Sequence, residues 1–277
     1  MTGLLAVSCT SAGSSSSTTA GGQGTAPVAG DAEGEVTWIA DGDTIDVDTV
    51  GGTITVRLVA INAPERGECF ADDALDHLID TLKGQHVDLV VVGEDQFGRT
   101  LAHVFAGDRH INLEMVESGL ATASTPEQDD PHGDAILEAE GYAFQAGFGL
   151  WSWTACGSEG PTPRVVIAGE LSEIDPPGPD DEALGAETIE VLNNGTEPVD
   201  LGGWILRDES ARHRFVFGGR PGDAVAQDFL LGPGEGFVVA SSDTGWEPGG
   251  GPVWNNDGDM VLLQLPDGTV VDRWRYP

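Results

Sequence analysis

The sequence predicts two β-rich domains in succession: a five-stranded Greek-key barrel of the OB type with added helices, and then an antiparallel β-sandwich. Three observations carry this prediction. The 277 residues are enough for two hydrophobic cores. Residues 35–156 mix strand and helix patterns, whereas residues 164–277 show only short strand-like runs. Between them, "GSEGPTP" (157–163) has the composition of a linker.

The first block opens with the alternating segment "EVTWIADGDTIDVDTVGGTITVRLVAI" (35–61), in which Gly51-Gly52 marks a hairpin turn. Apolar residues then recur at helical spacing in "ADDALDHLIDTLKG" (71–84). Two further strands and two further helices are expected, at "HVDLVVV", "RTLAHVFAG", "INLEMVESG" and "DAILEAEGYAFQAGFGLW". Three strands, a helix, two strands and then helices is the order typical of an OB barrel.

The second block contains roughly seven strand-like runs in about 110 residues, with turn residues between them. They are "RVVIAGELSEI", "ETIEVLNN", "VDLGGWILRD", "RFVF", "GEGFVVAS", "DMVLLQL" and "VVDRWRYP". This spacing predicts the sandwich.

The charge balance is strongly acidic. The formal net charge is -35, from 47 acidic and 12 basic residues, and Lys83 is the only lysine. Such a surface repels nucleic acid at long range. A nucleic-acid partner therefore requires a local cluster of arginines or a bound cation.

The N-terminal residues 1–34 read as the remnant of a signal and a flexible tether. Cys9 ends the apolar run "GLLAVSC" and precedes a Ser/Gly/Thr-rich stretch, which resembles the end of a bacterial lipoprotein signal. That resemblance implies a lipid anchor on Cys9 and a place in the cell envelope or outside the cell. The alternative is a disordered terminus with an incidental cysteine. Export would allow Cys69 and Cys156 to form a disulfide, and two separate buried thiols are the alternative.

Three motifs stand apart in the first block: "DGDT" (41–44), "RLVAINAPE" (57–65) and "DQFGR" (95–99). Together they resemble the staphylococcal nuclease (thermonuclease) family. Hydrolysis of a phosphodiester needs cations aimed at the phosphoryl oxygens and a group that handles the attacking water. The resemblance implies that Arg57 and Arg99 bind phosphate and stabilise the transition state, and that Glu65 positions or deprotonates the water. An arginine at a strand edge and a lone glutamate are otherwise usually solvated.

Calcium is the cofactor that the resemblance implies. Asp43 matches a carboxylate ligand, and Asp41 is expected to contribute through a water. Asn62 stands where the family has a second carboxylate, so it offers a carbonyl oxygen without the charge and weaker binding is expected. Ala63 offers its backbone carbonyl. Phe97 is a candidate to stack a nucleotide base, and a core position is the equal alternative.

The six histidines lie on different predicted elements without HxH or HExxH spacing, so no histidine metal or base site is expected.

The second block resembles the lamin-tail domain, an immunoglobulin-like sandwich, through "NNGTEPVDLGGWILRD", "FLLGPGEGFVVA" and "VWNNDGDMVLLQLPDGTVVDRWRY". Trp204 is expected to be buried. The resemblance implies a binding or adhesion module, and its ligand cannot be read from the residues.

Two hypotheses follow. The first is an exported, lipid-anchored, calcium-dependent nuclease that acts as a monomer on DNA, and on RNA as a further substrate, leaving 3'-phosphate ends. The second is a noncatalytic surface binding protein with a degenerate barrel.

Overall fold

The computed structural model describes residues 32–125, 130–158, 164–172, 187–210, 212–219, 229–243, 245–247, 253–254 and 258–276. Cys9 and residues 1–31 of the predicted tether lie outside the described residues. Residues 32–34 were predicted as the end of that tether, but they form the start of the first strand. In the part that is described, no helix has the length and apolar character needed to cross a membrane.

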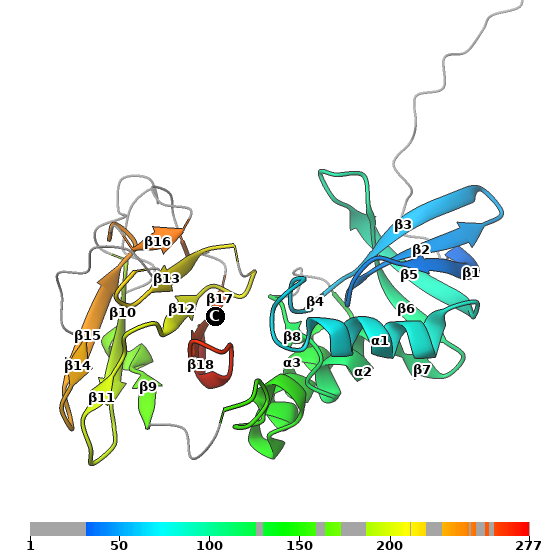
Figure 1. Ribbon diagram of the computed structural model, residues 1–277. Coiled ribbons are helices and arrows are strands. Elements are labelled where there is room, and N and C mark those ends of the chain that lie inside the picture. Colours follow the sequence, from blue (N-terminus) through cyan, green and yellow to red (C-terminus); the bar gives the residue numbers. More distant parts are fainter. Residues whose placement is uncertain are drawn as a thin grey trace, which may run out of the picture.

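Five strands close into a barrel, as the element order predicted (Figure 1). They are β1 (Ala32–Ile39), β2 (Thr44–Thr49), β3 (Gly52–Leu58), β5 (His86–Glu94) and β6 (Thr100–Ala106). Neighbours pair in the order β3-β2-β1-β5-β6, and a parallel pairing of β6 with β3 completes the circle. The short strand β7 (Arg109–His110) continues from β6.

Helices and a small second sheet surround one end of the barrel. Helix α1 (Ala71–Leu82) buries Leu78 and Leu82 against the barrel core, and α2 (Ile111–Glu117) buries Met115. Strand β4 (Ile61–Asn62) leaves the barrel and pairs with β8 (Thr122–Ala123). This exit matters because it carries Asn62, a predicted calcium ligand, away from the barrel wall.

The last helix of the barrel part is shorter than predicted. Helix α3 (Gly133–Ala146) ends because Gly147 adopts a left-handed conformation, with φ of 68°. A 3-10 turn, η1 (Gly149–Trp151), follows instead of a continuous helix to residue 151. Gly119 and Gly149 meet there backbone to backbone, since a Cβ on either would lie 2.2 Å from the other segment's nearest carbonyl oxygen.

The C-terminal part is an antiparallel arrangement of short strands. One sheet contains β15 (Gly236–Ala240), β10 (Thr188–Asn193) and β9 (Val165–Ile167), after which the chain turns through η2 (Gly169–Leu171). The second contains β16 (Trp246–Glu247), β13 (Arg214–Val216), β12 (Ile205–Arg207), β17 (Asp259–Gln264) and β18 (Val270–Tyr276). Strands β11 (Val199–Asp200) and β14 (Leu230–Leu231) form a separate pair. Trp204 is buried as predicted.

The two parts share a buried apolar cluster. Figure 1 shows them side by side, with β18 on the side of the sandwich that faces the helices of the barrel part. The cluster joins Ala143, Leu150 and Trp151 of the barrel part to Met260, Leu262 and Val270 of the sandwich. The sandwich is therefore packed against the barrel part rather than tethered to it by the linker alone.

Candidate functional site

The site is built where β2 and β3 meet. Asp43 lies just before β2, and the register of the hairpin places Thr44 opposite Arg57. The Nη2 atom of Arg57 is 3.1 Å from Oδ2 of Asp43. The backbone N–H of Leu58 donates to the carbonyl of Asp43 at 2.8 Å. Two of the predicted residues are thus held together by the barrel itself.

Burial dominates the electrostatics of Asp43, which is 8% exposed. Burial raises the pKa of Asp43 to about 6, against the opposing effect of the Arg57 guanidinium, and the neighbouring Asp41 raises it further. The Asp41 carboxylate accepts the backbone N–H of Asp43 at 3.1 Å. A second cation beside this pair would favour the ionised form of Asp43.

The chain that leaves the barrel brings the next two predicted residues to the same point. Asn62 Oδ1 accepts a hydrogen bond from Nη2 of Arg57 at 3.2 Å, and the backbone N–H of Ala63 donates to Oδ2 of Asp43 at 3.0 Å. Side-chain oxygens of Asp43 and Asn62 therefore converge on a single cationic nitrogen. Carboxylate and amide oxygens are hard donors of the type that calcium takes, and in this structure both contact the Arg57 guanidinium.

Glu65 lies farther along the same exit, on an exposed turn. Its backbone N–H donates to Oε2 of Glu68 at 2.8 Å. Among the described residues, no hydrogen bond or ion pair joins Glu65 or Arg99 to Asp43.

Arg99 and Phe97 belong to the turn between β5 and β6. The Nε atom of Arg99 is 2.7 Å from Oδ2 of Asp95, and its guanidinium carbon lies 5.8 Å from the centre of the Phe97 ring. Phe97 is 76% exposed, which excludes the core alternative for this residue. Strand β6 runs parallel to β3, with Thr100 opposite Val56. Arg99, the residue before β6, therefore lies next to the strand that carries Arg57.

A disulfide joins Cys69 to Cys156, with Sγ atoms 1.97 Å apart and Cα atoms 5.6 Å apart. Cys69 follows directly on Glu68, and Cys156 lies in the turn that follows η1. The bridge therefore ties the turn that carries Glu65 to the end of the helical region.

Three of the six histidines lie together, although each comes from a different part of the chain. Nδ1 of His103 is 3.1 Å from Nε2 of His110, and Nε2 of His103 is 2.9 Å from Oδ1 of Asp130. The His132 ring centre is 4.7 Å from that of His103. The hairpin of β6 and β7, in which Phe105 pairs with His110, brings His103 and His110 together, and His132 joins them from the start of α3. The spacing of these residues along the chain does not reveal the cluster.

A second group, outside the predicted ligands, has the composition of a metal site. Ligand atoms of Glu33, His86 and Asp88 lie within 4.8 Å of one another on exposed parts of β1 and β5. All three residues are exposed, and none of them contacts the site around Asp43 through a hydrogen bond or an ion pair in the described chain.

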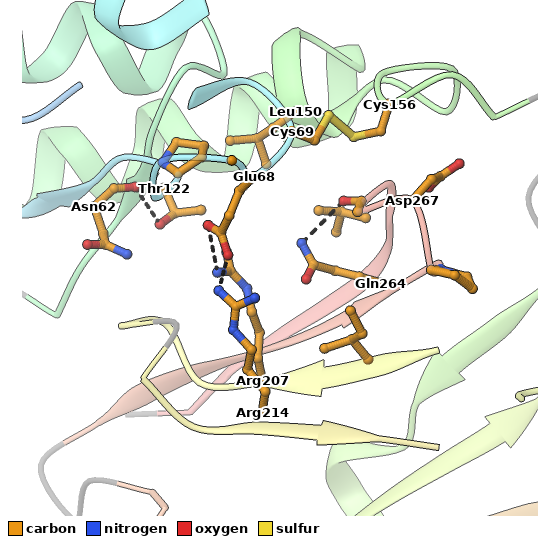
Figure 2. Close-up of a pocket in the computed structure, with 16 residues that line it drawn as sticks. Asn62, Glu68, Cys69, Thr122, Leu150, Cys156, Arg207, Arg214, Gln264 and Asp267 are labelled. Atoms are coloured by element: carbon orange, nitrogen blue, oxygen red, sulfur yellow. Dashed lines mark hydrogen bonds and ion pairs between the residues drawn. A yellow bond between two sulfur atoms is a disulfide. The ribbon is translucent and has the colours of Figure 1, made fainter. Parts of the chain in front are cut away.

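The sequence also gave no sign that the sandwich reaches the site. A cavity of about 180 Å³ lies between the two parts, with Asn62 and Glu68 on one side and Arg207 and Arg214 on the other (Figure 2). Arg214 forms a short ion pair with Oε1 of Glu68, and Nη1 of Arg207 is 3.6 Å from Oε2. Burial lowers the pKa of Arg207 to about 10, although the charges of Asp208 and Glu65 oppose this.

Comparison with known families divides the chain in the same order as the fold. The family described as staphylococcal nuclease homologue matches residues 55–153. The Lamin Tail Domain family matches residues 161–277.

Similar proteins include nucleases by name. A micrococcal nuclease of Shigella flexneri is 38% identical over 135 residues, covering 46% of this chain and 77% of the relative. An uncharacterized endonuclease of Haemophilus influenzae is 39% identical over 115 residues, covering 41% of this chain and 63% of the relative. A thermonuclease of Staphylococcus intermedius is 31% identical over 125 residues, covering 41% of this chain and 72% of the relative. The chain belongs to the staphylococcal nuclease family, and its nuclease domain is followed by a lamin tail domain.

Proposed function

We propose that the protein is an endonuclease that hydrolyses phosphodiester bonds of DNA, with RNA as a further substrate, and that it depends on calcium. The convergence of Asp43, Asn62 and Arg57 at the barrel exit carries this proposal. A guanidinium held by an ion pair and a hydrogen bond is oriented before a phosphate arrives, so little reorganisation is needed during the reaction. Membership of the nuclease family supports the same reaction class.

Calcium would be held by oxygens of Asp43, Asn62 and Ala63, and by Asp41 through water; bound there, it supplies positive charge that stabilises the phosphoryl oxygens. These are all hard oxygen donors, which is the set that calcium prefers. The loss of one carboxylate charge at Asn62 lowers the expected affinity.

The remaining steps belong to the side chains. Arg57 and Arg99 bind phosphoryl oxygens and stabilise the charge that develops on them. Glu65 accepts a proton from the attacking water, whose oxygen forms the new bond to phosphorus. The bond from phosphorus to the 5' oxygen breaks with its electron pair on that oxygen, which takes a proton from solvent water, so the products are a 3'-phosphate and a 5'-hydroxyl. Phe97 would stack against a base, and its exposure beside Arg99 supports this role.

Export is part of the proposal. A disulfide between Cys69 and Cys156 suits an oxidising compartment, and a lipid on Cys9 would hold the protein at the cell envelope. The lamin tail domain would add a binding or adhesion role there, and the protein is proposed to act as a monomer.

The test is cleavage of single-stranded and duplex DNA by the chain from residue 32 to its end. The assay uses millimolar calcium or a chelator, and it compares the wild type with Glu65→Gln and Arg57→Ala. Cleavage that needs calcium and falls by about 100-fold or more in both variants is expected. A folded wild-type protein that cleaves neither substrate would exclude the enzyme and favour the surface binding protein.

A further inference from the structure

The loop between β12 and β13 of the lamin tail domain reaches the nuclease site through a main-chain contact. Nδ2 of Asn62 donates to the backbone carbonyl of Glu209 at 2.8 Å, while Oδ1 of the same amide accepts from Arg57. Because a carbonyl accepts hydrogen bonds and does not donate them, it selects the NH₂ end of the amide. The oxygen of Asn62 is thereby turned toward Arg57.

This contact accounts for the amide at position 62. A carboxylate there would place an oxygen acceptor against the carbonyl of Glu209, and the two would repel. Asparagine provides a donor for the lamin tail domain and an acceptor for the nuclease site at once.

Glu209 is itself firmly held. Its backbone N–H donates to Oδ1 of Asp259 at 3.2 Å, and its carboxylate lies 2.9 Å from Nη1 of Arg275. The carboxylate also accepts the backbone N–H of Thr125 at 3.0 Å. The carbonyl that faces Asn62 therefore has a fixed position rather than that of a free loop.

A second connection reaches the turn of Glu65. Glu68 closes this turn twice: its backbone N–H donates to the carbonyl of Glu65 at 2.8 Å, and its carboxylate accepts the N–H of Glu65 at 2.8 Å. The same carboxylate is paired with Arg207 and Arg214, as Figure 2 shows. Arg207 is only 6% exposed, so its pairing is shielded from water.

We propose that the lamin tail domain positions the nuclease site, with Arg207 and Arg214 holding the Glu65 turn through Glu68, and the carbonyl of Glu209 orienting Asn62. This inference rests on the proposed function, since it takes Glu65 and Asn62 as working residues. The arginines act through Glu68 and are positioning residues. A merely adhesive interface would hold the two domains together without affecting turnover.

The first test compares Arg214→Gln with Arg273→Gln in the full chain. Arg273 is the matched control, because it also crosses the interface in an ion pair, with Glu140, but away from the turn. Each variant is assayed well below its own midpoint of thermal unfolding. Arg214→Gln is expected to lower kcat about tenfold with KM for DNA nearly unchanged, and Arg214→Lys to restore part of the loss. Arg273→Gln is expected to lower thermal stability and to leave kcat within about twofold.

Two further variants test the route. If Arg214 acts through Glu68, the double variant Arg214→Gln/Glu68→Gln is expected to lose no more kcat than Glu68→Gln alone. Asn62→Asp is expected to lower kcat/KM at saturating calcium, although it restores a negative charge.

The outcomes separate the two proposals. A wild type that does not cleave DNA refutes the nuclease. A wild type that cleaves, with kcat unchanged in Arg214→Gln or lowered equally in Arg273→Gln, refutes the positioning role and leaves the nuclease standing. Additive losses in the double variant refute the route through Glu68, and an Asn62→Asp variant more active than the wild type refutes the role of the Glu209 carbonyl.

Discussion

Arg273 of β18 donates through Nη1 to Oε2 of Glu140 in α3 at 2.7 Å, so an ion pair joins the last strand of the lamin tail domain to the last helix of the nuclease domain. Glu140 is 1% exposed. Its carboxylate also accepts the backbone N–H of Ala123 and lies 3.6 Å from Arg275. Burial raises the pKa of Glu140, and the two arginines oppose that rise.

Removal of this carboxylate is expected to destabilise the protein strongly. Glu140→Ala leaves the partly buried guanidinium of Arg273 without a carboxylate partner on α3, and losing the buried member of such a pair costs about 3 kcal/mol. Unfolding in urea measures the loss. Glu138→Ala, an exposed change on the same helix, serves as control and is expected to stay within about 0.5 kcal/mol of the wild type. Equal effects of the two changes would show that the pair contributes nothing specific.

The disulfide is expected to contribute through the long loop that it closes. Cys69 and Cys156 are 87 residues apart, and a loop of this length corresponds to about 4 kcal/mol in the chain-entropy model. A Cys69→Ala/Cys156→Ala variant should unfold at correspondingly lower urea concentration, and the wild type in reductant should match it. Cys9 can contribute one free thiol, so more than one free thiol per chain in the unfolded, unreduced wild type would contradict the bridge.

Asp43 is expected to oppose stability while supporting activity. Its pKa is raised from 3.8 to about 6 in the fold. Between these two pH values, the native state therefore holds a proton that the unfolded chain has released. The free energy of unfolding therefore falls as the pH rises from about 4 to 6, and ionised Asp43 lowers it by about 1–3 kcal/mol at pH 7. In chelator, Asp43→Asn should be more stable than the wild type at pH 7 and equal to it near pH 4.

The same variant should need more calcium. Loss of one ligand charge is expected to raise the calcium concentration for half-maximal cleavage by about tenfold. An Asp43→Asn protein with unchanged calcium dependence would place the metal elsewhere, for example at Glu33, His86 and Asp88.

The histidine cluster is expected to make the protein sensitive to acid. Burial lowers the pKa of His110 to about 4, and the charges of His103 and His132 act in the same direction, whereas Asp130 opposes them. Unfolded histidine takes up a proton near pH 6.5, so this contribution is complete above that pH and is lost as the pH falls toward 4. Between pH 7 and pH 4, the free energy of unfolding of His110→Gln should fall by about 1–2 kcal/mol less than that of the wild type. The difference is no larger because the partly solvated ring is screened by water.

Chemical denaturation across this pH range tests the point, with the exposed change His86→Gln as control. If both variants follow the wild-type curve, the cluster is not the source of the acid sensitivity.

The local patterns of the sequence predicted much of the fold. Apolar spacing located α1, which buries Leu78 and Leu82, and Gly51-Gly52 marked the hairpin of β2 and β3. Predictions of this kind succeed because periodicity and turn residues act within a few residues of each other. The prediction that the last helix runs to residue 151 was wrong, because Gly147 ends α3. A glycine within an apolar helical pattern does not show by itself which backbone conformation it will adopt.

The site was predictable for the residues that lie on the hairpin of β2 and β3 and on β4, the strand that leaves the barrel. Asp43, Arg57 and Asn62 meet through pairing between neighbouring strands. The roles of Glu65 and Arg99 stay predictions, because neither is joined to Asp43 by a hydrogen bond or an ion pair in the described structure. The contact of Arg214 with Glu68 spans 146 residues along the sequence. In a chain with so many acidic residues, no local pattern indicates which glutamate an arginine of the other domain will contact.

The shared apolar cluster limits how the gene can be rearranged. Exchange of the lamin tail domain for another module would expose Leu150 and Trp151 to water and would leave the Glu140 carboxylate without Arg273. Domain shuffling works most easily between units that meet only at a linker. Here recombination at residues 159–163 would separate the two halves of a common core, so the two domains are expected to be inherited together. Substitutions on one side of their interface are expected to be accompanied by substitutions on the other.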